Sequence, residues 1–231
     1  MKSFLRIGFA AIALILFFNA FAVTETKAQG ILNEILKRME THRQSLASLQ
    51  ANVSMAKYNA QLGETDTTQG TIMYLPAKGR DALVRIDWTS PMQETLSVVN
   101  KQYVLYRPRL GQAIVGKADG RGKDTKANSA LAFMSMSKDE LKANYNVQYL
   151  GQENVSNGAP TWHLKLTPKT ANSYKYAEIW VDGNGMPIQG RVVESNDDAT
   201  TVMLSNLQKN VNLDTNKFKV NLPKGTKRVE S

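Results

Sequence analysis

Residues 94–116, ETLSVVNKQYVLYRPRLGQAIVG, decide how this chain folds. The runs ETLSVV, QYVLYRP and QAIVG are rich in β-branched and aromatic residues and are bounded by Asn, Pro or Gly, a pattern typical of short strands. Connections this short favour antiparallel neighbours. Apolar residues also follow one another directly, as at Val98 and Val99, so both faces of these strands avoid water over part of their area.

The same two-residue period recurs over most of the chain. DGNG at residues 182–185 is a strong hairpin signal, because Gly supplies the positive φ that such turns require. About eleven strands are therefore predicted. The other strands are at 51–62, 70–75, 82–88, 145–155, 161–168, 176–182, 187–195 and 200–208.

Residues 30–49 have the helical period instead. The apolar stripe of this predicted amphipathic helix consists of Ile31, Ile35, Met39, His42, Leu46 and Leu49. One long helix and one short helical insertion cannot cover a flat sheet of eleven strands. A strongly curved sheet has a concave face narrow enough for helices to plug. The predicted fold class is α+β, mainly β: an unclosed antiparallel β-barrel with a helical lid or plug.

The insertion NSALAFMSM, residues 128–136, is the predicted lid. It follows a Gly- and Lys-rich tether and precedes SKDELKANY, a capped polar helical turn. Leu131, Phe133, Met134 and Met136 are expected to point into the mouth of the curved sheet, and Met adapts well to irregular apolar partners. The alternative is that these methionines simply fill the core. The basic loop 117–126 either touches a membrane or is a solvated tether.

The N-terminus is predicted to be a secretory signal peptide, residues 1–28. Lys2 and Arg6 precede an apolar run, and cleavage after Ala22 or Ala28 fits the small-residue rule. A retained membrane anchor is the alternative. The remainder, residues 29–231, is expected to form one domain. There is no Cys, so this domain has no disulfide. The net charge of +9 falls to +7 after either cleavage, which would draw the protein toward anionic surfaces.

The sequence offers little for catalysis. It has two histidines, His42 and His163, and none of the usual nucleophile, nucleotide or zinc motifs. His163 alternates with Trp162 and Leu164 and is interpreted as a surface residue. Acidic residues do not cluster at metal-ligand spacing, so no metal and no cofactor are expected. Three features together indicate a protein with a cavity for an apolar ligand. They are the strands with two apolar faces, the apolar insertion and the lack of a catalytic constellation.

The order of elements resembles the periplasmic lipoprotein carrier family, LolA, over nearly the whole mature chain. The pieces that carry the resemblance are the opening helix before ANVSM, GTIMYL before RIDWTSP, ETLSVVNKQYVLYRPRLGQA, WHLKLTPK, IWVDGNGMPIQ and the closing FKVNLPKGTKRV. LTPK and the closing element are the most specific. The resemblance implies a periplasmic carrier, not an enzyme. Such a carrier accepts acylated lipoproteins at an inner-membrane release complex and hands them to an outer-membrane acceptor.

The resemblance also implies an arginine that latches the lid, and Arg80 falls at that place. Arg85 is a second candidate, although alternation turns it outward. The expected protein is a monomer that binds acylated lipoproteins or lipids, contacts membranes transiently and does not bind nucleic acid. The alternative is an envelope sensor of the same fold, which would need a further module after the last strand. The predicted acyl-binding cavity is lined by Ile72, Tyr74, Val84, Ile86, Trp88, Leu96 and Val98.

Overall fold

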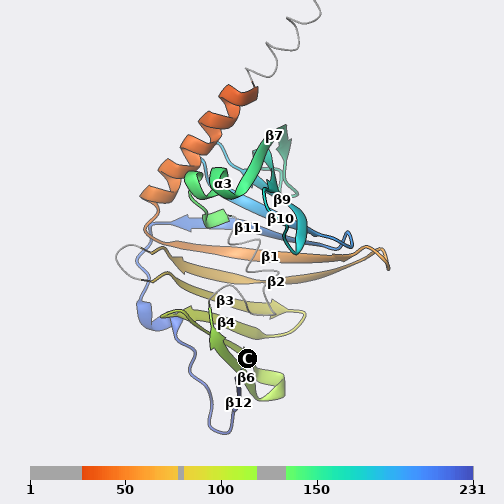
Figure 1. Cartoon of the computed structure of the whole chain (residues 1–231). Helices are drawn as coiled ribbons and strands as arrows, with labels where there is room; N and C mark the ends of the chain where they lie inside the picture. Colours follow the sequence, from red (N-terminus) through yellow and green to blue (C-terminus); the bar gives the residue numbers. More distant parts are fainter. Residues whose placement is uncertain (1–27, 78–80, 119–133, 231) are drawn as a thin grey trace, which may run out of the picture.

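The computed structural model describes residues 28–77, 81–118 and 134–230, and its strands form one twelve-stranded sheet (Figure 1). The spatial order is β12-β6-β5-β4-β3-β2-β1-β11-β10-β9-β8-β7. The strands are β1 (Leu49–Asn59), β2 (Glu64–Leu75), β3 (Leu83–Ser90), β4 (Glu94–Val99), β5 (Gln102–Arg107), β6 (Gln112–Lys117), β7 (Tyr145–Asn154), β8 (Pro160–Pro168), β9 (Tyr174–Val181), β10 (Pro187–Glu194), β11 (Ala199–Lys209) and β12 (Lys227–Glu230).

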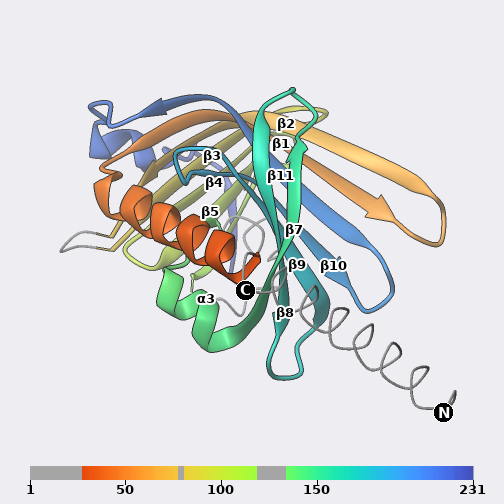
Figure 2. The same ribbon diagram turned by 90° about the horizontal axis from the view of Figure 1, so that it is seen from above.

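All neighbouring strands are antiparallel except β12, which pairs in parallel with β6. The first eleven strands are the predicted ones, and the twelfth lies in the closing element. The sheet curls strongly but its outer strands, β12 and β7, do not pair with each other (Figure 2). The predicted fold, a mainly β unclosed barrel, is confirmed.

The concave face is packed by the N-terminal helix, whose described part is residues 28–45, and by α3 (Lys138–Asn144) (Figure 2). Ile35 and Leu36 on the helix are at most 1% exposed, and Leu141 on α3 is fully buried. These side chains join one large apolar cluster with the inward residues of the sheet. Burial of this cluster is what holds the helices inside the curve.

The N-terminal helix ends four residues earlier than the apolar stripe predicts. Its last backbone bond runs from Leu46 N–H to the His42 carbonyl, at 2.9 Å. Beyond it, Ala47 N–H donates to Asn210 Oδ1 at 2.7 Å and Ser48 Oγ donates to the Val211 carbonyl at 2.5 Å. These hydrogen bonds to the segment after β11 replace the helical backbone bonds, so the chain leaves the helix here and continues into β1.

The β9–β10 turn packs against the N-terminal helix and requires a glycine. Gly185 has φ +84°, and a Cβ there would lie 2.4 Å from the backbone carbonyl of Arg38. Arg38 in turn donates from Nη1 to the Gly183 carbonyl at 3.1 Å. The DGNG turn, predicted as a hairpin, therefore also forms the surface against which the N-terminal helix packs.

The convex face is covered over β2 to β4 by the C-terminal segment. The 3₁₀ helix η2 (Thr215–Phe218) places the fully buried Phe218 against Leu75 and Leu83. Ser97 Oγ donates to the Phe218 carbonyl at 2.5 Å. This cover explains why strands in this part of the sheet are apolar on both faces.

No helix in the described ranges is long and apolar enough to cross a membrane. The predicted signal peptide lies almost entirely in residues 1–27, outside those ranges.

Candidate functional site

The strand register places an apolar ladder across the concave face. Ile72 lies opposite Ile86, Ile86 opposite Leu96, Leu96 opposite Leu105, and Leu105 opposite Ile114. Residues directly opposite in antiparallel strands share one face. Ile72 and Ile86 belong to the cluster that contains the N-terminal helix, so this face is the concave one. The ladder runs without a polar residue from β2 to β6.

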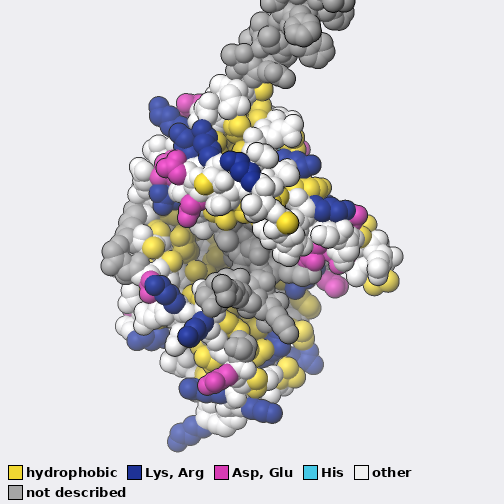
Figure 3. Space-filling view, viewed as in Figure 1, with side chains coloured by type: hydrophobic (Ala, Val, Ile, Leu, Met, Phe, Trp, Pro, Cys, Tyr) yellow, Lys and Arg dark blue, Asp and Glu magenta, His cyan; other side chains and the backbone are white. Residues whose placement is uncertain are grey.

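This concave face divides into two parts that differ in burial. We call the inward side chains of β7 to β11 the filled half, and Leu164, Ile179 and Val202 there are fully buried. We call the inward side chains of β3 to β6 the open half. Five of its eight apolar side chains are only half-buried: Val84, Leu96, Val98, Tyr103 and Ile114. Figure 3 shows hydrophobic side chains gathered over these strands, in the lower part of that view.

An ion pair closes the open half at one end. Glu94 and Arg107 occupy inward positions, and Arg107 Nε lies 3.1 Å from Glu94 Oε1. Both side chains are between 24% and 31% exposed, so the two charges are partly removed from water and each is compensated by the other. Beyond this pair, the inward positions of the open half carry no charge.

The register puts all seven predicted cavity residues on the concave face. Tyr74, Val84, Leu96 and Val98 are half-buried, whereas Ile72, Ile86 and Trp88 are already covered by other side chains of the protein. Partial burial raises the pKa of Tyr74, an effect that Arg43 partly opposes. The binding role of these seven residues stays a prediction.

Three inward residues on β5 and β6 were missed from the sequence: Tyr103, Leu105 and Ile114. Alternation within QYVLYRP and QAIVG does separate the two faces of each strand. It does not say which face of one strand continues that of the next, and only the register does so.

The described end of the predicted lid packs onto the concave cluster. Met134 and Met136 are half-buried and contact that cluster, and residues 134–135 are helical. Leu131 and Phe133, the other two predicted lid residues, lie outside the described residues. These two methionines therefore contact the concave cluster, and their role as a lid stays a prediction.

Comparison with known proteins gives a family for this arrangement. The family model of the outer membrane lipoprotein carrier protein LolA matches residues 44–221, which include the open half, the lid segment and the convex-face cover. The chain belongs to the LolA family. The resemblance read from the sequence is thereby confirmed. A comparison with curated protein sequences found no match.

Solved structures agree with the fold expected of a LolA family member. An uncharacterized conserved protein from Thermus thermophilus is 13% identical with a TM-score of 0.55, over 87% of this chain and 99% of that one. MucB is 14% identical with a TM-score of 0.53, over 82% of this chain and 62% of MucB. MucB has also been solved in complex with MucA. At these identities the likeness concerns the fold alone.

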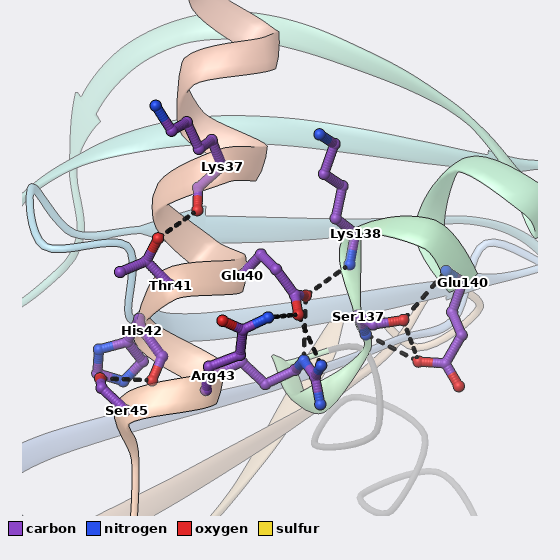
Figure 4. A network of polar contacts seen from close by, with 10 residues as sticks. Lys37, Glu40, Thr41, His42, Arg43, Ser45, Ser137, Lys138 and Glu140 are labelled. Carbon is purple, nitrogen blue, oxygen red and sulfur yellow. Dashed lines mark hydrogen bonds and ion pairs between the residues drawn. The ribbon is translucent and has the colours of Figure 1, made fainter.

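In this LolA family member the Glu40 carboxylate links the N-terminal helix to the backbone at Lys138, just after the predicted lid (Figure 4). Arg43 donates to it from Nη2 at 2.7 Å and from Nε at 3.1 Å, and the backbone N–H of Lys138 donates at 3.2 Å. The bonds from Arg43, followed by that from Lys138, hold the pKa of Glu40 at about 2 although partial burial opposes them. A charged carboxylate is thus built into the joint between the helix and α3.

Immediately after Met136, the chain is fixed by the start of α3. Ser137 is its N-cap: its Oγ accepts from Glu140 N–H at 3.2 Å, and its own N–H donates to Glu140 Oε2 at 2.8 Å. This reciprocal pair is a capping box, as the SKDE sequence indicates. The chain just after Met136 is therefore held at a joint made by Glu40 and the capping box.

The arginine expected to latch the lid falls at Arg80, which lies outside the described residues. Arg85, the second candidate, faces outward as alternation predicts. It pairs with Asp87 at 2.7 Å and donates from Nη1 to the carbonyls of Lys217 and Lys219, at 2.8 and 3.2 Å. Arg85 therefore clamps the C-terminal segment onto the convex face and does not reach the lid side.

The interpretation of His163 as a surface residue was wrong. Its side chain does lie on the convex face but is only 13% exposed, because it stacks on Trp180 at 4.2 Å between ring centres. Its two ring nitrogens face the carboxylates of Glu153 and Glu178, at 3.5 and 3.3 Å. Within the described ranges no three acidic or histidine side chains gather as metal ligands would.

Proposed function

We propose that this protein is a carrier that holds the acyl chains of lipoproteins, or of lipids, on the open half of its concave face. The observation that carries the proposal is the apolar ladder from Ile72 to Ile114, which is uncharged and in which Leu96 and Ile114 are only half-buried. An acyl chain can still bury apolar area on such a surface, and each methylene buried there contributes about 0.8 kcal/mol to the binding free energy. Membership of the LolA family supports the same function.

The proposal includes the route of the cargo. The precursor is exported by a signal peptide that is cleaved after Ala22 or Ala28, and residues 29–231 act in the periplasm as one domain. The carrier receives its cargo from an inner-membrane complex and delivers it to an acceptor at the outer membrane. It needs no cofactor and performs no chemical step on the cargo.

Access to the open half is controlled by the lid segment in this proposal. Met134 and Met136 pack against the concave cluster, so an entering acyl chain competes with them for the same apolar contacts. Leu131 and Phe133 complete the lid, and Arg80 latches it in the absence of cargo. Methionine suits this task because its unbranched side chain adapts to either partner.

The test is the lipid and peptide content of protein purified from the cell envelope, measured by native mass spectrometry. Val98→Asp places a charge in the open half, while Val104→Asp places the same charge on the opposite face, where Val104 is equally half-buried opposite Ser97. The wild type and Val104→Asp should carry acylated cargo, and Val98→Asp should be empty. Equal loading of the two variants would refute the proposal, and capture of an unacylated protein would favour the sensor alternative.

A further inference from the structure

Large apolar side chains with high exposure are few among the described residues, and two of them lie in adjacent turns. Leu110, 67% exposed, is in the 3₁₀ turn η1 (Pro108–Leu110) between β5 and β6, and Met92, 49% exposed, is in the β3–β4 turn. The ion pair between Glu94 and Arg107 joins these two turns at 3.1 Å. The two apolar side chains therefore stand at the same end of the sheet.

Cations surround this apolar pair. The turn before β12 lies beside η1, because Lys227 N–H donates to the Gly111 carbonyl at 2.8 Å. The three turns together, residues 90–94, 107–112 and 223–227, contain four cations and one acid. The acid, Glu94, is already paired with Arg107. Three exposed cations remain at this end of the sheet: Arg109, Lys224 and Lys227.

The turns hold the apolar side chains outward. η1 is closed by Gly111 in the left-handed conformation, φ +56°, whose N–H donates to the Pro108 carbonyl at 3.0 Å. Thr226 donates from N–H and Oγ1 to the Pro223 carbonyl, at 3.2 and 2.8 Å, which fixes the neighbouring turn. Figure 3 shows dark-blue and yellow side chains together at this lower end of the molecule.

We propose that this basic tip, made of Met92, Arg109, Leu110, Lys224 and Lys227, docks onto the surface of an anionic phospholipid bilayer. The two apolar side chains are separate and protruding, so they suit shallow insertion between headgroups better than a flat protein contact. The cations lie beside them, where phosphate and glycerol headgroups would be. This inference does not rest on the proposed carrier function, because none of the five residues of the basic tip belongs to the open half.

The first test is co-sedimentation of the purified protein with vesicles of phosphatidylethanolamine and phosphatidylglycerol, compared with vesicles of phosphatidylcholine alone. Binding should require phosphatidylglycerol and should weaken as salt increases. Lys224→Gln and Lys227→Gln should each lower the affinity about fivefold. The double variant Met92→Asp/Leu110→Asp should lower it more than tenfold.

Leu150 supplies the matched control. It is 45% exposed in β7, at the opposite edge of the sheet and away from the three turns. Leu150→Asp should leave vesicle binding unchanged. A loss in Leu150→Asp equal to that in the double variant, or binding that ignores phosphatidylglycerol, would overturn the proposal.

A second measurement detects insertion directly and does not depend on a loss of binding. Leu110→Trp should give a blue-shifted tryptophan emission on anionic vesicles and protection from acrylamide, whereas Leu150→Trp should give neither. The three natural tryptophans contribute the same background to both variants. Identical spectra of the two variants with vesicles would show that the basic tip does not enter the bilayer. Cargo loading of the tip variants should be normal, which separates this proposal from the carrier function.

Discussion

Replacing Phe218 by alanine is expected to destabilise the protein by about 3–5 kcal/mol. The ring is fully buried between Leu75 and Leu83 on the convex face, so its removal leaves a cavity as well as losing apolar burial. The neighbouring backbone cannot collapse freely into that space. Ser97 holds the Phe218 carbonyl at 2.5 Å, and Arg85 holds the carbonyl of residue 217 at 2.8 Å.

The assay is urea unfolding followed by tryptophan fluorescence, together with a thermal scan. For a domain of this size, about 2–4 °C of melting temperature corresponds to each kcal/mol, so a drop of about 6–20 °C is expected. Leu213→Ala provides a graded comparison, because this residue packs on the same cluster but is only partly buried, and it should cost about 1–2 kcal/mol. A loss below about 1 kcal/mol for Phe218→Ala would refute the idea that the C-terminal segment is an integral cover of the sheet.

Two further predictions concern the β9–β10 turn under the N-terminal helix and the Glu40 contacts between this helix and α3. Gly185→Ala should cost about 2–4 kcal/mol in urea unfolding, because it adds left-handed strain and a clash with the Arg38 backbone, whereas Gly183→Ala, with open space around its Cβ, should cost less than about 1 kcal/mol. Glu40 has its pKa lowered to about 2 in the folded state, so its contribution to stability is present above pH 4.5 and is lost as the pH falls toward 2. Solvent screening limits this contribution to about 1 kcal/mol. Glu40→Gln should therefore reduce stability clearly at pH 6 and much less at pH 2, and an equal loss at both pH values would contradict the assignment.

The strands could be predicted from the sequence because their period is local. Alternation of β-branched and aromatic residues with polar ones marks β1 to β11 to within about three residues, except that β2 begins at Glu64, six residues before the predicted strand at 70–75. β12 is different: its four residues include one apolar side chain, and it pairs in parallel with β6, a partner more than a hundred residues earlier. A short strand of this kind has no period of its own, so only the tertiary pairing defines it.

The end of the N-terminal helix shows where a local pattern gives way to tertiary contacts. Leu46 and Leu49 continue the helical stripe and are both buried, so the pattern was correct about burial at these two positions, whereas Ile31 at the start of the stripe is 43% exposed. Ser48 and Ala47 nevertheless bond to the segment after β11, and those bonds are stronger determinants of the backbone than the stripe. The role of Arg85 was equally out of reach, since its carbonyl partners are 132 and 134 residues away.

A half-open concave face also fits the energetics of the proposed transfer. Full burial of an acyl chain of about sixteen carbons would contribute about 12 kcal/mol, and three such chains would exceed the practical limit of about 20 kcal/mol for non-covalent binding. A carrier that filled its cavity around the cargo could not release it. In the proposed function, half-buried residues such as Val84, Leu96 and Val98 would shield a chain on one side, and displacement of Met134 and Met136 would use part of the energy gained. Exchange with a second apolar surface of similar quality then becomes nearly neutral, so no nucleotide is needed to drive it.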